Sequence, residues 1–103
     1  MSIYKEFNLH WRGREVLISY CADYSIAFRQ VMGATLAHLT IQSADGEKLP
    51  ISDTGFVSHF AMGGLGIEND DQIPALVEQR LNEEAKNQAW QEYVRDSQQL
   101  RLF

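Results

Sequence analysis

The amino-acid sequence predicts a single α+β domain, in which a small, mainly antiparallel sheet of three to four strands is covered by one long C-terminal helix. Three patterns predict it: segments with strand periodicity in the first half, a short glycine-containing connection between two of them, and a long helix-favouring run near the end. A chain of 103 residues is long enough for one hydrophobic core and not for two. We assign residues 1–97 to this domain and residues 98–103 to a C-terminal tail.

Three segments have the composition and alternation of strands. Residues 3–11 alternate between apolar and polar side chains, and residues 14–21 are rich in β-branched and aromatic residues. The connection Arg12-Gly13 between them favours a hairpin. Residues 36–42 form the third predicted strand. We expect the helix to pack on the sheet face that bears Phe7, Leu9, Trp11, Leu39 and Ile41.

Two segments have less regular patterns. Residues 23–33 (DYSIAFRQVMG) are compatible with a short helix, an irregular loop or a further edge strand. Residues 49–66 contain Pro50, Gly55 and a glycine cluster at 63–66, and we expect an ordered but irregular excursion. Its several large apolar side chains would hold it against the core.

The helix is expected to run from about residue 72 to about residue 96, after Asp70-Asp71 and with Pro74 in its first turn. Its apolar positions repeat every four residues, a spacing that drifts around a helix of period 3.6. The buried face therefore either winds around the helix, or the helix breaks near Asn82 or Asn87. The sequence leaves both alternatives open. The positions concerned are Val77, Leu81, Ala85, Ala89 and Tyr93.

The charge distribution disfavours direct binding of nucleic acids. The formal net charge is −5, and residues 66–103 carry eight acidic against four basic residues. Nucleic-acid binding needs a cluster of Lys and Arg, and the sequence has none. An acidic helix is compatible with a basic protein surface as a partner. We therefore expect a protein partner.

Composition also bears on the cellular compartment. No apolar run approaches the length of a membrane span, and the N-terminal MSIYKEF lacks the apolar stretch of a signal peptide. The single Cys21 excludes an internal disulfide and fits a reducing environment. We expect a cytoplasmic protein without membrane contact, with Cys21 packed in the core at a strand end.

No combination of residues predicts catalysis, a metal or another cofactor. Ser58 and His59 are adjacent, so on an extended backbone they point to opposite faces and do not share a proton. The nearby Asp53 is better explained as a turn residue. The three histidines and Cys21 lack ligand spacing, and the glycine cluster lacks the Lys-Ser/Thr of a phosphate-binding loop. We expect a non-enzymatic protein.

The stretch LPISDTGFVSHF, residues 49–60, with the upstream AHLTI, resembles a segment of small uncharacterised bacterial proteins often found in mobile-element or prophage regions. Those proteins share the pattern LPI(S/T)xTG(Y/F)xSHF between a strand hairpin and an acidic helix. The resemblance implies this order of elements and this genomic setting, and no activity. Within the stretch, a second binding surface would use Ser52, Thr54, Gly55, Ser58 and His59.

The final residues, QLRLF, resemble the QLxLF peptide by which bacterial replication and repair proteins dock on the DNA polymerase sliding clamp. Gln99, Leu100, Leu102 and Phe103 stand at the motif positions, and Arg101 replaces the more usual Ser or Asp. The resemblance implies docking of this tail on the host clamp. The alternative is that its apolar side chains complete the core of the domain.

The predicted function is a non-catalytic interaction or adaptor protein of a phage or mobile element, docked through QLRLF on the host sliding clamp. One alternative is an acidic inhibitor of a host defence or DNA-binding enzyme, and another is a small enzyme that uses His59. The sequence leaves the oligomeric state open. In the inhibitor, acidic side chains would imitate phosphate spacing: Glu78, Glu83, Glu84, Glu92 and Asp96.

Overall fold

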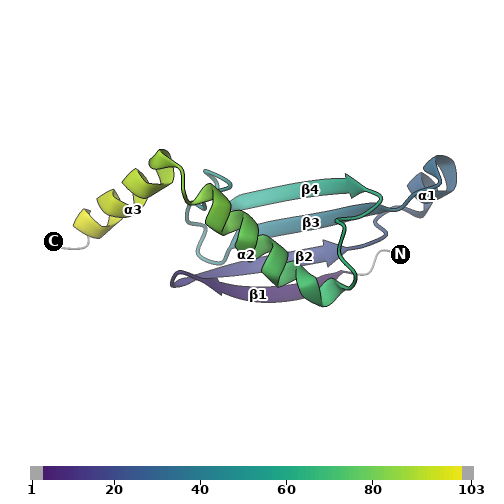
Figure 1. Cartoon of the computed structure of the whole chain (residues 1–103), viewed down its shortest axis with the longest axis horizontal. Coiled ribbons are helices and arrows are strands. Elements are labelled where there is room, and N and C mark those ends of the chain that lie inside the picture. The colour runs from purple at the N-terminus through teal and green to yellow at the C-terminus, as the bar shows by residue number, and fades with distance from the viewer. Residues whose placement is uncertain (1–3, 101–103) are drawn as a thin grey trace.

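The computed structural model describes residues 4–100 of the chain, with the side chains of residues 97–100 left out of that description. Four strands form one antiparallel sheet in the order β1-β2-β3-β4. The molecule is elongated, with extents of 56 × 22 × 22 Å. Two short helices project from its opposite ends (Figure 1). The elements are β1 Lys5–Trp11, β2 Arg14–Cys21, α1 Ile26–Met32, β3 Leu36–Ser43, β4 Phe56–Met62, η1 Asp70–Gln72, α2 Ile73–Glu84 and α3 Gln88–Leu100.

The predicted hairpin is confirmed. Arg12 and Gly13 connect β1 to β2, and both have positive φ angles, 49° and 79°. Positive φ at both positions is the signature of the tight turn that suits the twist of a two-stranded ribbon. Trp11 therefore pairs with Arg14, and the register continues regularly to Lys5 opposite Tyr20. This hairpin fixes which side chains of β1 and β2 face the core.

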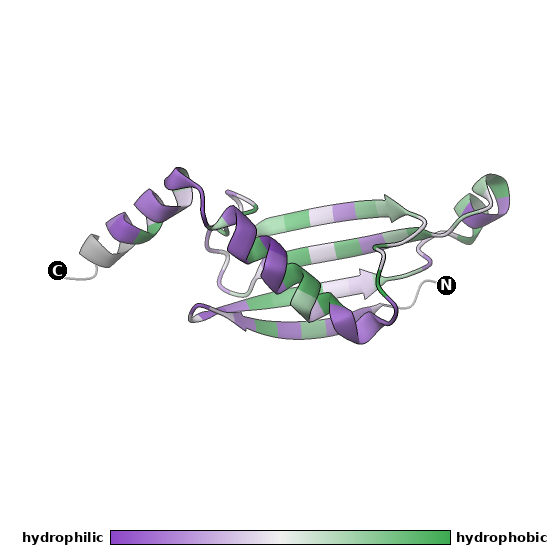
Figure 2. Ribbon diagram, in the orientation of Figure 1, coloured by the Kyte–Doolittle hydropathy of each residue, from purple (hydrophilic) through white to green (hydrophobic). Residues whose placement is uncertain are grey.

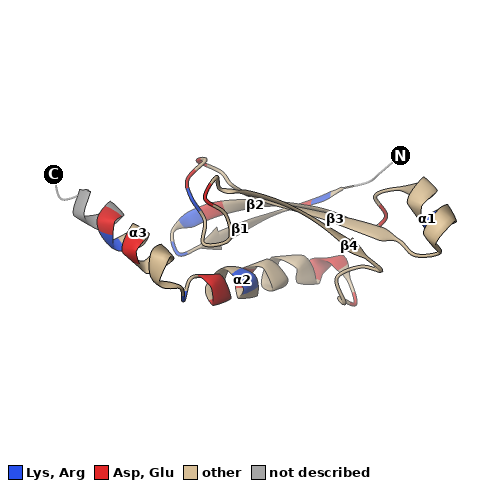
Figure 3. Cartoon of the chain, turned by 90° about the horizontal axis from the view of Figure 1, so that it is seen from above, with Lys and Arg blue, Asp and Glu red and all other residues tan. Residues whose placement is uncertain are grey.

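The alternation of the strands separates two faces of the sheet (Figure 2). The apolar side chains predicted for one face do face α2, which packs across them with Ile73, Val77 and Leu81. Cys21 is buried at the end of β2, as expected. Among the described residues, no helix covers the opposite face, which we call the open face (Figure 3). The core residues from the strands include Leu9, Trp11, Val16, Ile18, Tyr20, Ala37, Leu39 and Ile41.

The fourth strand comes from the stretch expected to be irregular, and that expectation was wrong for Phe56–Met62. This strand pairs with β3 along its whole length, from Phe56 opposite Gln42 to Met62 opposite Leu36. The glycines on either side of the strand indicate turns, whereas the FVSHFAM stretch between them contains no glycine or proline. Residues 23–33, for which three conformations were open, contain helix α1. Ser25 caps this helix through its Oγ, which accepts from the backbone N–H of Phe28 at 3.1 Å.

The expected single C-terminal helix is wrong: the described chain has α2 and α3, separated at residues 85–87. Of the two alternatives left open by the sequence, the break near Asn87 is the one observed. The Asn87 Oδ1 accepts from the backbone N–H of Trp90 at 2.7 Å and starts α3 as an N-cap. Its Nδ2 donates to the carbonyl of Glu84 at 2.6 Å and closes the end of α2. One asparagine thus ends one helix and begins the next.

Replacing Asn87 with alanine is expected to lower the free energy of unfolding by about 1 kcal/mol, because the Trp90 N–H loses its cap. Asn87→Asp keeps the capping oxygen for Trp90 but loses the donor to the Glu84 carbonyl, so its loss of stability should be smaller than that of Asn87→Ala. Chemical denaturation of the three proteins measures the difference. An Asn87→Ala protein more stable than the wild type would contradict the role of the cap and would indicate that α2 and α3 join into one helix.

Candidate interaction surface

The segment LPISDTGFVSHF begins with a tight turn that ends in β4. Leu49 is fully buried and forms an isolated bridge with Ser52. The Ser52 Oγ lies 3.0 Å from the Thr54 Oγ1 and donates to the carbonyl of Phe56 at 2.8 Å. Gly55 follows with a φ of 74° and accepts from the backbone N–H of Ser43 at 2.8 Å. These polar residues therefore hold the entry into β4.

Ser58 and His59 point to opposite faces of β4, as the sequence predicted. His59 pairs with Leu39 and lies on the face toward α2. There it lines a cavity of about 310 Å³ together with apolar side chains and Arg80. The guanidinium of Arg80 already lies 3.5 Å from a carboxylate oxygen of Glu84. The cavity is at the small end of the range for ligand pockets, about 300–1,000 Å³. We interpret it as incomplete coverage of the sheet by α2.

Ser58 contacts a different histidine on the open face. Its Oγ lies 2.8 Å from the Nε2 of His38, and the Nδ1 of the same ring lies 2.7 Å from the hydroxyl of Tyr4. The sequence alone does not show this arrangement, because His38 and Ser58 come into contact through the register between β3 and β4. The feature of the sequence that points to this contact is that both residues fall on the polar side of their strands.

The ring of His38 is also the centre of an aromatic group that we call the open-face cluster: Tyr4, Tyr24, His38 and Phe60. His38 stacks on Phe60 with ring centroids 4.3 Å apart and an angle of 9°. Tyr24 meets both rings edge-on, at 5.0 Å from His38 and 5.2 Å from Phe60. Phe60 nevertheless remains 46% exposed. The cluster therefore presents aromatic surface to solvent from an ordered position.

The chain of Ser58, His38 and Tyr4 has the distances of a nucleophile, a base and an orienting group, but not their electrostatics. In the Ser-His-Asp triad the histidine gains a positive charge during the reaction, and a buried carboxylate orients the ring and stabilises that charge. Desolvation raises the pKa of the Tyr4 hydroxyl above its ordinary value, with smaller contributions from Cys21 and Tyr24, and the partner of His38 here is this phenol in place of a carboxylate. The arrangement orders the side chains of the open face.

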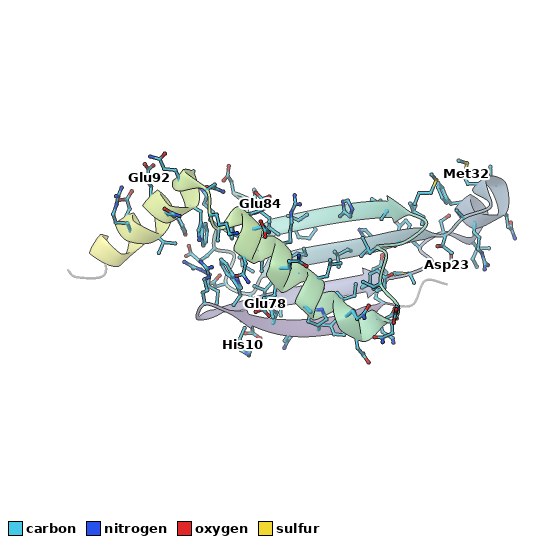
Figure 4. The ribbon with its side chains drawn as sticks, in the orientation of Figure 1. His10, Asp23, Met32, Glu78, Glu84 and Glu92 are labelled. Atoms are coloured by element: carbon cyan, nitrogen blue, oxygen red, sulfur yellow. The ribbon has the colours of Figure 1, made fainter. Side chains whose placement is uncertain are left out.

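Helix α1 adds exposed apolar side chains at the same end of the sheet. Among its described residues none is buried, and Val31 is 81% exposed. Ile26 and Met32 are about half exposed, and Met32 is the last residue of the helix (Figure 4). Tyr24, which directly precedes the cap of α1, joins this helix to the open-face cluster. Exposed apolar groups of this kind mark surfaces that bind other proteins.

Helix α3 leads toward the predicted docking tail. Its described contacts with the core come from its first half, through Trp90, Tyr93 and Val94. The helix then extends away from the sheet at the end opposite α1 (Figure 1). The α3 backbone includes Gln99 and Leu100, so the tail assigned to residues 98–103 begins inside this helix. The Gln99 and Leu100 side chains, and all of Leu102 and Phe103, lie outside the described residues.

The acidic residues of α2 and α3 are interspersed with bases (Figure 3). Glu84 lies 3.5 Å from Arg80, and Glu83 lies 3.8 Å from Lys86. Glu78 and Glu92 stand on two different helices (Figure 4). The sequence suggested five acidic residues as phosphate mimics, Asp96 among them. These residues are divided between two helices and therefore do not form one continuous anionic row.

Two further observations concern the part of the chain that the structure describes. Within residues 4–100, no helix combines the length and apolarity needed to cross a bilayer. In the same residues, no three side chains of His, Cys, Asp or Glu come together in a group suited to a metal ion.

Comparison with protein families shows which family the chain belongs to. Residues 4–90, most of the chain, match the family described as the KlcB third domain. The chain belongs to this family. The matched range contains the whole sheet, α1, α2 and the start of α3 through Trp90, and it ends before residues 98–103. No curated protein and no solved structure is significantly similar to the chain.

Proposed function

We propose that this KlcB third domain is a non-catalytic interaction module of a phage or other mobile element. The mobile-element setting is supported by the resemblance of residues 49–60 to proteins from such regions. The non-catalytic role is supported by the chemistry of the open face. There the Ser58–His38 contact has a neutral phenol in place of a carboxylate.

We propose further that Gln99, Leu100, Leu102 and Phe103 dock on the bacterial sliding clamp. The observation that carries this proposal is the QLRLF pattern placed on and directly after α3, a helix that leads the chain away from the sheet (Figure 1). A docking peptide needs distance from its own domain, so that a second protein can reach both sides of it. Direct contact with nucleic acid has no part in this proposal, since the charge distribution disfavours it.

The physical chemistry of the motif fits a transient contact. An apolar pocket would capture Leu102 and Phe103, and the Gln99 amide would set the register. Burial of each large side chain contributes about 1.5–3 kcal/mol, from which the ordering of the segment is subtracted. The expected Kd is therefore about micromolar, equivalent to about −8 kcal/mol.

The second surface of the adaptor is proposed to be the open-face cluster with α1. Of the five residues considered for it from the sequence, Ser58 is the one in hydrogen-bond contact with this cluster. Ser52, Thr54 and Gly55 instead build the turn before β4, and His59 lies on the opposite face. Aromatic residues held in place lose little conformational entropy on binding, which suits them to an interface.

Binding to a purified sliding clamp tests the docking proposal. The full chain is compared with a version truncated after Gln98 and with the double variant Leu102→Ala/Phe103→Ala, and the Tm of each is recorded. We expect micromolar binding by the full chain and none by either variant, at unchanged Tm. Absence of binding by the full chain would refute the proposal. A Tm several degrees lower in both variants would instead place these side chains in the core.

A further inference from the structure

Strand β4 is an edge of the sheet without the usual protection against pairing. Its sequence FVSHFAM contains no charged residue and no proline, and its register with β3 is continuous, without a bulge. Edge strands of soluble proteins normally carry at least one such feature, because their free backbone groups attract another strand. Among the described residues, nothing pairs with the outer side of β4.

Hydrogen bonds at both ends of β4 fix which of its backbone groups face outward. The N–H of Ser43 donates to the carbonyl of Gly55, and the N–H of Gly63 donates to the carbonyl of Thr35. Backbone direction alternates along an antiparallel strand, so residues 57, 59 and 61 also bond toward β3. The N–H and C=O groups of Ser58, Phe60 and Met62 therefore point to the free edge.

The opposite edge of the sheet has the protection that β4 lacks. Strand β1 carries Lys5 and Glu6. The Nζ of Lys5 lies 3.2 Å from a carboxylate oxygen of Asp70. Charged side chains on an edge strand disfavour the approach of a second strand. The two edges of this sheet thus differ in kind, and β4 is the one suited to association.

We propose that β4 pairs antiparallel with β4 of a second copy of the chain, around a two-fold axis at His59. This register pairs all seven residues of the strand with one another. Phe56 then stands opposite Met62, Val57 opposite Ala61, and Ser58 opposite Phe60. The two four-stranded sheets become one continuous sheet.

Charge and symmetry favour a second copy as the occupant. The chain has a net charge of −5 at pH 7, with His counted as neutral, and β4 contains no Asp, Glu, Lys or Arg. Two copies therefore meet without like charges opposed along the paired strands. The outward-facing backbone groups of Ser58 in one copy bond to those of Phe60 in the other. This pair occurs twice, once on each side of the axis, as an isologous interface requires. The proposal is independent of the C-terminal tail, because it uses β4 alone.

Sedimentation of the full chain from about 1 μM to about 100 μM tests the proposal. We expect the mass to approach twice the chain mass of 11.8 kDa as concentration rises. Met62→Lys adds a charge at a side chain that is 63% exposed, and Ser58→Pro removes an outward N–H; both should remain monomeric. Asn8→Lys on the β1 edge is the matched control and should dimerise. A monomeric wild type, or dimers of both β4 variants, would overturn the proposal.

A cross-link tests the position of the two-fold axis. In the proposed register His59 faces its own copy at a non-hydrogen-bonded pair, where the two Cβ atoms come close enough for a disulfide. In a Cys21→Ser background, His59→Cys should form a covalent dimer on mild oxidation. His10→Cys, on the other edge, should not. Equal cross-linking of both variants, or none by His59→Cys, would contradict pairing about His59.

Discussion

Gly55→Ala is expected to lower the free energy of unfolding by about 3–5 kcal/mol. Gly55 has a φ of 74°, and an added Cβ would overlap the carbonyl oxygen of Glu47 and lie 2.5 Å from the Oγ of Ser43. That hydroxyl donates to the same carbonyl at 2.6 Å, and Ser43 is buried. The methyl group would therefore break a buried hydrogen bond as well as strain the backbone.

Gly46→Ala is the matched control for this effect. Gly46 has a φ of 75°, and a Cβ added there would meet no atom within 4 Å. The two substitutions carry the same backbone penalty, about 1 kcal/mol, and differ in the space available. Thermal and chemical denaturation of both variants separates strain from overlap. Equal losses of stability in the two proteins would contradict the close packing of Gly55 against residues 43–47.

Trp90→Ala is expected to cost about 3–5 kcal/mol and to release α3 from the domain. Trp90 is 3% exposed, and its ring lies 5.8 Å from that of Trp11 and 5.3 Å from that of Tyr93. The guanidinium of Arg14 lies 5.1 Å above the same ring. Trp90 is the buried contact of α3 among the described residues, and its loss leaves the helix held by the half-buried Tyr93 and Val94.

Hydrogen exchange of α3 distinguishes this local release from general loss of stability. In the Trp90→Ala protein, amide protection should fall first in α3 and remain in the sheet. Gln91→Ala changes an exposed neighbour on the same helix and should shift stability by less than about 0.5 kcal/mol. Continued protection of α3 in Trp90→Ala would show that other contacts hold the helix.

The strands that the sequence predicted were those in which alternation and a turn signal agree. Residues 5–11 alternate, residues 14–21 are a β-branched and aromatic run, and Arg12-Gly13 joins the two as a hairpin. Strand β4 was missed because its two faces are both mixed: Phe56 and Phe60 on the open face, His59 on the face toward α2. A pattern of period two is hidden when neither face is purely polar.

The helix break and the open-face cluster depend on contacts that the sequence does not display. Helix propensity runs through residues 72–96 almost without interruption, and Asn87 ends α2 because burial of Trp90 against Trp11 requires the chain to turn. His38 was expected to be a solvated sheet residue. Its stacking on Phe60 arises from the pairing of β3 with β4, which was not predicted.

The salt dependence of clamp binding tests the proposed function most directly. An apolar segment in a pocket is little affected by ionic strength, whereas a contact made by acidic helices weakens steeply as salt rises. The full chain is titrated into a sliding clamp at low and high salt, beside the variant Leu102→Ala/Phe103→Ala. We expect a micromolar Kd that barely changes with salt and is lost in the variant. Binding that survives the variant and disappears at high salt would contradict docking through the C-terminal motif.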